Sequence, residues 1–222
     1  IEFYPVIDSA NMRPADWVNI ARAIETHYDQ YDGFIVLHGT DTMAYTASAL
    51  SFMLRNLNKP VICTGSQIPI SELRNDGLKH ILDSLLILQE IDIPEVCVYF
   101  NDQLYRGNRT RKIDADSLDA YASPNFPAIG KFGTKLSLRT DLILDRPTEA
   151  LAIQVIHDPM IASLTIFPGF KAEIIDAVVK LPIDGLVLST YGAGNAPSQD
   201  KALLRSIERA TGEGVIVVNV TQ

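Results

Sequence analysis

The chain has 222 residues, a formal net charge of −8 and two cysteines. Hydrophobic residues make up 47% of it and charged residues 21%, which is typical of a globular protein and excludes wholesale disorder, a collagen-like fibre and a disulfide scaffold. The acidic balance disfavours nucleic-acid and anionic-membrane partners, because like charges repel. No apolar run reaches the ~18 residues of a membrane-spanning helix, so we expect neither nucleic acid nor membrane as a partner.

Both cysteines, Cys63 and Cys97, lie within short apolar runs. This pattern predicts buried free thiols, which are typical of a reducing compartment. The chain begins at Ile1 with a segment that has the pattern of a strand, and it ends at Gln222 directly after another. We therefore expect these residues to be a piece of a longer protein, cut at both ends.

Short apolar runs alternate with helical patterns in the first part of the chain. A strand pattern at 3–7 is followed by a helix that begins at Pro14 and keeps one apolar face as far as Tyr28. The same alternation predicts strands at 34–38, 61–64 and 95–100, with helices at 43–57 and 78–85. Alternating strands and helices predict a parallel sheet with helices on its faces.

The alternation breaks between Asn101 and Ser137, where we expect a functional loop or hairpin because the stretch is too long for a simple connection. Residues 151–157 have the pattern of a strand that joins the sheet. The alternation then resumes with strands at 161–167, 185–190 and 214–220, and helices at 172–180 and 198–209.

The predicted fold class is α/β with two domains, each a mainly parallel sheet with helices on both faces. Residues 1–157 form the first predicted domain. Residues 158–222 form a second, incomplete domain.

Parallel sheets bind ligands beyond the carboxyl ends of their strands, and polar residues gather at those positions in this sequence. They are Asp8 and Ser9, His38 to Thr42, Thr64 to Gln67, Arg111 with Lys112, and Tyr191 to Asn195 in the second domain. The first-domain groups combine hydroxyls, a carboxylate, a lysine and free backbone N–H groups. Nucleophilic attack on a carbonyl needs such a set: a hydroxyl that attacks, a base that takes its proton and donors for the oxyanion.

Each feature also has a structural interpretation. The sequence Gly-Thr-Asp-Thr at 39–42 is an ordinary turn and helix-cap sequence, and the basic residues from Arg106 to Lys112 are typical of a solvated loop. His38 has the position of a hydrogen-bonded structural histidine. The other histidines show no metal-ligand spacing, and no Gly-x-Ser-x-Gly elbow, phosphate-binding loop or dinucleotide fingerprint is present. We therefore expect no metal and no cofactor.

Five segments, in order along almost the whole chain, resemble signature segments of the bacterial-type L-asparaginases. They are Tyr4 to Met12, Ile35 to Met43, Thr64 to Pro69 with Arg74 to Gly77, Leu104 to Lys112, and Thr190 to Pro197. Their details are closer to the cytoplasmic type I branch than to the periplasmic type II branch. Five ordered segments together are far more specific than any one of them alone.

The resemblance implies a catalytic set. Thr40 corresponds to the second catalytic threonine of the family, Asp41 to its acidic partner and Lys112 to the lysine that completes the set. The Asp41 carboxylate is also expected to pair with the substrate ammonium.

The family's first catalytic threonine lies in a Thr-Gly-Gly-Thr motif that this sequence lacks, and the end of the family's second domain is absent as well. The resemblance thus implies that residues 1–157 are the N-terminal catalytic domain without its first strand and loop, and that the native protein extends by roughly one strand-loop unit before Ile1 and by more beyond Gln222. We therefore expect no asparaginase activity from these residues alone.

The resemblance also implies how a substrate is held. Asp8 and Ser9 correspond to a loop that binds the α-amino and α-carboxyl groups, and Gly39 is expected to contact the substrate as well. Ser66 matches a position whose backbone carbonyl faces the leaving amide. Asn195 matches a polar residue near a neighbouring subunit that helps to close the site. Members of the family are usually tetramers, so we expect a homo-oligomer built as a dimer of dimers.

The implied reaction is hydrolysis of L-asparagine to L-aspartate and ammonia by threonine nucleophilic catalysis, without a cofactor or a metal. Three alternatives stay open: the amidase subunit of a tRNA-dependent amidotransferase, a non-catalytic asparagine-binding protein, and an asparaginase domain within a larger lipid-hydrolysing protein. Ammonia release that requires tRNA and a partner, binding without turnover, and ankyrin-like repeats after Gln222 would identify them in turn.

Overall fold

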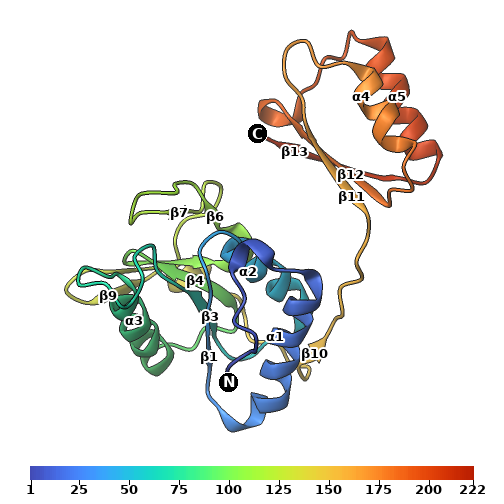
Figure 1. Ribbon diagram of the computed structural model, residues 1–222. Coiled ribbons are helices and arrows are strands. Elements are labelled where there is room, and N and C mark those ends of the chain that lie inside the picture. The colour runs from blue at the N-terminus through green and yellow to red at the C-terminus, as the bar shows by residue number, and fades with distance from the viewer. The chain divides into compact units, whose positions relative to one another are not determined.

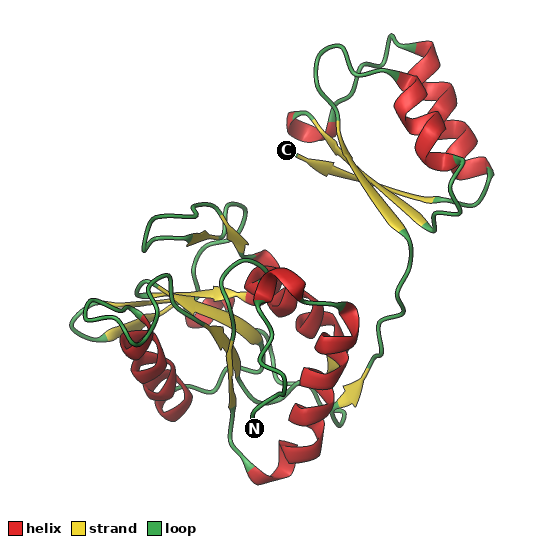
Figure 2. Cartoon of the chain, viewed as in Figure 1, coloured by secondary structure: helices red, strands yellow, loops and turns green.

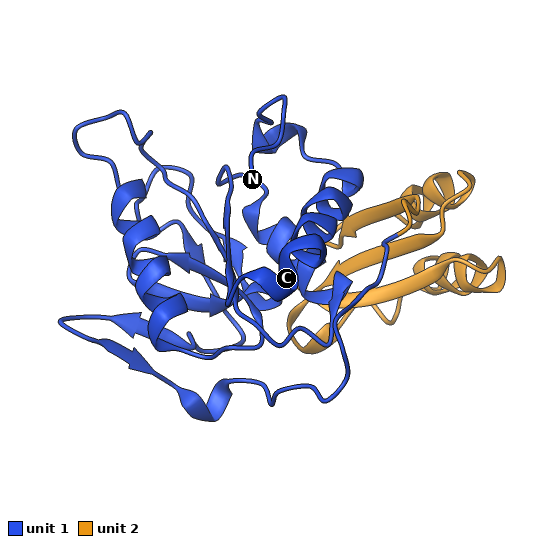
Figure 3. Cartoon of the chain, turned by 90° about the horizontal axis from the view of Figure 1, so that it is seen from below, with its two compact units in different colours: residues 1–156 blue, residues 157–222 orange.

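The computed structural model describes residues 1–222 and divides into two compact units, residues 1–156 and 157–222 (Figure 3). Each unit has its own sheet and its own hydrophobic core. The structural division lies one residue before the boundary that the sequence predicts.

A six-stranded sheet forms the centre of the first unit, in the order β1-β3-β4-β5-β8-β9. Its strands are β1 Phe34–Leu37, β3 Val61–Thr64, β4 Val96–Phe100, β5 Gln103–Arg106, β8 Gly130–Phe132 and β9 Leu136–Leu138. The first three are parallel, and each pair beyond β4 is antiparallel. The helices around this sheet are α1 Pro14–His27, α2 Met43–Met53 and α3 Gly77–Glu90 (Figure 1).

Helices cover both faces of this sheet, as predicted. Along β3 and β4, which are buried throughout, successive residues belong to two different hydrophobic clusters. Cys63 and Val98 pack in the cluster that holds α1 and α2, whereas Ile62 and Tyr99 pack in the cluster that holds Ile87 of α3. Because side chains alternate across a strand, the two clusters lie on opposite faces.

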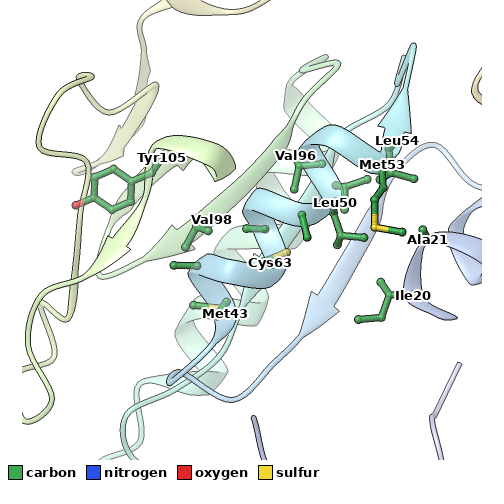
Figure 4. Packing of buried hydrophobic residues seen from close by; sticks show 14 of the residues in the cluster. Ile20, Ala21, Met43, Leu50, Met53, Leu54, Cys63, Val96, Val98 and Tyr105 are labelled. Carbon is green, nitrogen blue, oxygen red and sulfur yellow. The ribbon is translucent and has the colours of Figure 1, made fainter. Parts of the chain in front are cut away.

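Helix α2 is the most deeply buried helix of the first unit. Its residues Met43, Ala47, Leu50 and Met53 recur at helical spacing and are fully buried. All four belong to one cluster with Ile20 and Ala21 of α1 and the strand residues Cys63, Val96 and Val98. Figure 4 shows Met43, Leu50 and Met53 within this cluster. The start of α2, and with it the turn that precedes it, is therefore held by the core.

The segment between residues 101 and 138 is a series of hairpins, where the sequence predicts a functional loop or hairpin. Three of its strands, β5, β8 and β9, extend the main sheet with antiparallel pairs, so this sheet is half parallel rather than mainly parallel. A tight turn joins β4 to β5 directly, and strands joined in this way must run antiparallel. A separate hairpin pairs β6 Arg111–Lys112 with β7 Tyr121–Ala122.

Two expected strands differ in the structure. The predicted strand at 3–7 is wrong, since residues 1–8 are exposed and pair with no strand. An apolar run becomes a strand only where a neighbour completes its hydrogen bonds, and Pro5 has no amide hydrogen to offer. Residues 151–157 contain only β10 Ala152–Ile153, which pairs with β2 Leu54–Arg55 in a separate two-stranded sheet and does not join the main one.

The second unit is a parallel three-stranded sheet with two helices. Its elements are β11 Ile161–Thr165, α4 Ala172–Val179, β12 Gly185–Thr190, α5 Lys201–Gly212 and β13 Ile216–Thr221. Both helices stand on the same side of the strands (Figure 2), and β12 is buried at every second residue. The α/β class is confirmed, but in this unit helices cover one face of the sheet, not both. None of the helices in either unit is both long enough and apolar enough to cross a membrane.

A glycine at the end of β3 makes the close approach of two strand ends possible. A Cβ atom on Gly65 would lie 2.1 Å from the carbonyl oxygen of His38, which follows β1. We expect Gly65→Ala to lower the free energy of unfolding of the first unit by about 1–3 kcal/mol, since a backbone atom would have to move. Urea unfolding followed by the fluorescence of Trp17, the one tryptophan, measures this.

Gly133→Ala is the matched control, because its nearest contact would be the Lys135 carbonyl oxygen at 3.9 Å. Equal unfolding midpoints for the two variants would contradict the prediction.

Candidate active site

The three residues expected to form a catalytic set contact one another. Thr40 and Asp41 lie in the turn between β1 and α2, and Lys112 lies on β6, 72 residues after Thr40. The Lys112 Nζ donates to Thr40 Oγ1 and to Asp41 Oδ1, both at 2.9 Å. The lysine side chain is 19% exposed and the Asp41 side chain 62%, so the carboxylate is open to solvent while the amine is largely enclosed.

The turn at 39–42 is fastened to the segment that contains Asp8 and Ser9. Thr42 Oγ1 donates to the carbonyl oxygen of Ser9 at 2.7 Å, and a Cβ on Gly39 would lie 2.6 Å from Ser9 Oγ. The structure therefore brings Ser9 against the threonine turn, and a residue larger than glycine at position 39 would have to displace the Ser9 side chain. The carboxylate of Asp8 is exposed and accepts from the backbone N–H of Ala10, which caps the short 3₁₀ helix Ser9–Asn11.

His38, the residue before this turn, is a hydrogen-bonded structural histidine, as expected. Its Nδ1 lies 2.7 Å from the carbonyl oxygen of Gly39, and its Nε2 lies 2.8 Å from Thr46 Oγ1, which also accepts from Trp17 Nε1. Since a carbonyl only accepts, Nδ1 carries the hydrogen and Nε2 accepts from the threonine. Burial lowers the pKa of His38 and so favours this neutral form.

Tyr121 also reaches the turn, although no motif in the sequence points to it. Its hydroxyl donates to the carbonyl oxygen of Thr40. Burial, together with the negative charge of Asp41, raises the pKa of this hydroxyl, which keeps it a donor. An aromatic residue inside a segment without clear periodicity gives no local signal for such a role; only the pairing of β6 with β7 places it there.

The loop after β3, which carries Ser66, is held by contacts of the two residues that follow Ser66. The Asp76 carboxylate accepts from the backbone N–H groups of residues 67–68, at 3.0 and 2.9 Å. The side-chain amide of Gln67 donates to two carbonyl oxygens within 115–117, both at 3.1 Å. This amide therefore connects the loop that carries Ser66 to the segment between β6 and β7.

Asn195 belongs to the second unit. Its side-chain amide donates to the carbonyl oxygen of Gly192 at 3.1 Å, and its backbone pairs with Tyr191. These contacts close the turn at 191–195 after β12, and they leave Asn195 exposed.

A hydroxyl, an amine and a carboxylate in mutual contact are suited to attack on a carbonyl carbon. The amine can exchange a proton with the hydroxyl, and the carboxylate stabilises and orients the ammonium. No three His, Cys, Asp or Glu side chains are placed to share a metal ion.

The two cysteines are unsuited to be nucleophiles. Both are free and fully buried, and burial raises the pKa of Cys63 to about 12 and that of Cys97 well above its ordinary value. They face opposite sides of the sheet, since they belong to different clusters. Thiolates are the reactive form, so neither thiol competes with the hydroxyl of Thr40.

Known proteins are similar to this chain both in sequence and in structure. A family model described as "Asparaginase, N-terminal" matches residues 1–144, and one described as "Glutaminase/Asparaginase C-terminal domain" matches residues 160–222. All of the chain aligns at 48% identity with L-asparaginase 1 of Escherichia coli, of which it covers 65%, and at 45% identity with L-asparaginase of Dirofilaria immitis, of which it covers 38%. The chain thus spans less than two thirds of the length of either relative.

A solved structure is equally similar. The crystal structure of L-asparaginase I from Vibrio cholerae has a TM-score of 0.96 against this chain at 46% identity. The match covers 100% of this chain and 68% of that one.

The raised pKa values of the thiols give a testable expectation. At about pH 8 the native protein should release almost no colour from a disulfide thiol reagent, because very little thiolate is present and both sulfurs are buried. In concentrated guanidinium chloride both thiols should react. The exposed position of Ser198 offers a control, since Ser198→Cys should add one thiol that reacts at once in the native protein. A thiol that reacts quickly with the reagent in the native, unaltered protein would contradict the expectation.

Proposed function

This chain belongs to the asparaginase family, and from that premise we propose that the protein to which it belongs hydrolyses the side-chain amide of L-asparagine to L-aspartate and ammonia. The observation that carries the proposal is the contact of Lys112 with both Thr40 and Asp41. Similarity to L-asparaginase 1 of Escherichia coli over the whole chain supports the same reaction.

In the proposed reaction a threonine hydroxyl attacks the amide carbon of the substrate and forms a tetrahedral oxyanion. Ammonia leaves with a proton, which gives an acyl-threonine ester, and water then hydrolyses the ester to aspartate and the free hydroxyl. Lys112 exchanges the proton of the Thr40 hydroxyl, because its Nζ lies 2.9 Å from Oγ1. Asp41 holds the resulting ammonium of Lys112 in place. The proposed reaction consumes one water and requires no cofactor or metal.

The substrate contacts are part of the proposal. The α-amino and α-carboxyl groups of the substrate would be bound by Asp8, Ser9 and Gly39. The packing of Ser9 against Gly39, beside Thr40, supports this assignment. The exposed carboxylate of Asp41 would pair with the substrate ammonium.

Two further residues complete the proposed site. The backbone carbonyl of Ser66 would face the leaving amide, and Asn195 would approach the site of a neighbouring subunit. We propose with them a cytoplasmic homotetramer built as a dimer of dimers. Two free buried thiols, which suit a reducing compartment, support the location.

Removing the Thr40 hydroxyl tests the proposal. In the full-length protein, we expect Thr40→Val to lower kcat for ammonia release from L-asparagine by at least about 100-fold, because general acid-base catalysis contributes that much. Lys112→Met should lose a similar factor. The kcat of the double variant should be no lower than that of the less active single variant, because the effects of residues that act as a unit are not additive.

Thr26→Val is the matched control, because it removes a hydroxyl that bonds only its own helix, at the carbonyl of Arg22. It should keep the unaltered kcat. Full activity of Thr40→Val would overturn the assignment of the catalytic set. Ammonia release that appears only with tRNA and a partner subunit would replace the proposal with an amidotransferase, and asparagine binding without turnover would replace it with a binding protein.

A further inference from the structure

The hairpin of β6 and β7 carries two side chains that donate hydrogen bonds to Thr40. Lys112 and Tyr121 are direct partners across this antiparallel pair. Side chains of paired residues point to the same face of a sheet, so both extend toward the turn at 39–42. Lys112 Nζ donates to the side chain of Thr40, and the Tyr121 hydroxyl donates to its backbone carbonyl oxygen. Thr40 is therefore held at two points by one element.

The ring and the hydroxyl of Tyr121 have separate surroundings. The ring is buried in the core and lies 4.9 Å, centroid to centroid, from that of Phe100. The backbone carbonyl of Tyr121 accepts from the Tyr105 hydroxyl at 3.2 Å, which fixes the strand itself. Core packing thus needs only an aromatic ring at position 121. The hydroxyl is the one part of the side chain that leaves the core, and it ends on Thr40.

The carbonyl that Tyr121 binds belongs to the peptide bond between Thr40 and Asp41. Fixing the plane of that peptide limits ψ of Thr40 and φ of Asp41, and these angles set where the hydroxyl and the carboxylate point. The carbonyl before it, that of Gly39, is already bonded by His38. Two successive carbonyl groups of the turn are therefore held by side chains, and the Tyr121 bond is the one between the two reactive groups.

We propose that Tyr121 is a positioning residue for the reaction: its hydroxyl fixes the Thr40–Asp41 peptide so that the Thr40 hydroxyl and the Asp41 carboxylate meet Lys112 together. The inference rests on the proposed function of this site. It goes beyond the catalytic set, since it assigns to the hairpin partner of Lys112 a part in aligning the hydroxyl. A misplaced reacting group costs rate even when binding is intact.

Tyr121→Phe in the full-length protein removes the hydroxyl and keeps the ring. We expect kcat for asparagine to fall about tenfold, the factor expected for losing one such hydrogen bond, while KM changes less than about twofold. Hydrogen exchange followed by mass spectrometry should also speed up in a peptide that covers residues 39–43, because the turn loses a restraint.

Tyr99→Phe is the matched control. Tyr99 is equally buried in the other core of the same unit, and its hydroxyl donates to Asp83 Oδ2 at 2.6 Å, far along the chain from the turn. This variant should lose stability without a selective fall in kcat and without faster exchange at 39–43.

The outcomes separate this inference from the proposed function. A protein that does not turn over asparagine overturns the proposed function, and the exchange measurement still tests whether Tyr121 holds the turn. Activity that Thr40→Val abolishes but Tyr121→Phe leaves intact overturns the positioning role alone. A fall in kcat that the Tyr99→Phe control matches shows a structural effect and likewise overturns it.

Discussion

The contact of Lys112 with Thr40 and Asp41 joins two segments that are 72 residues apart, and the arrangement of the candidate site depends on it. The parallel strands alone cannot supply this amine, because Lys112 lies outside the main sheet. The chain reaches it through β5 and the short 3₁₀ helix Gly107–Arg109. A Cβ on Gly107 would lie 2.8 Å from the carbonyl oxygen of Val96 and 3.1 Å from that of Ala47, so a glycine lets this helix pack closely enough to bring the lysine over the turn.

The rest of the first unit gives that contact a rigid base. Helix α2 begins directly after the turn and packs one face into the core, while β3 and β4 are buried on both faces. The hydroxyl of Tyr121 and the ring of His38 then hold two carbonyl groups of the turn itself. Polar groups taken from solvent in this way must be bonded, and here their bonds also orient the reactive side chains. Core packing and site geometry are therefore one set of constraints.

The second unit follows a simpler plan. Three parallel strands carry two helices on one face, and a turn closed by Asn195 follows the central strand. This turn stands at the carboxyl end of β12, the end at which parallel sheets bind ligands. The proposed role of Asn195 toward a neighbouring subunit agrees with that position and with its exposure.

The sequence by itself predicted the α/β class, most of the helices and parallel strands, and the set of Thr40, Asp41 and Lys112, because helical and strand periodicity and the family's ordered motifs are local. Only the tertiary structure decided which strands pair. It left residues 3–7 unpaired, gave the main sheet an antiparallel half, and set Tyr121 opposite Lys112. The partner and the register of a strand depend on hydrogen bonds to residues far away in the chain. The pattern of residues within the strand therefore cannot predict them.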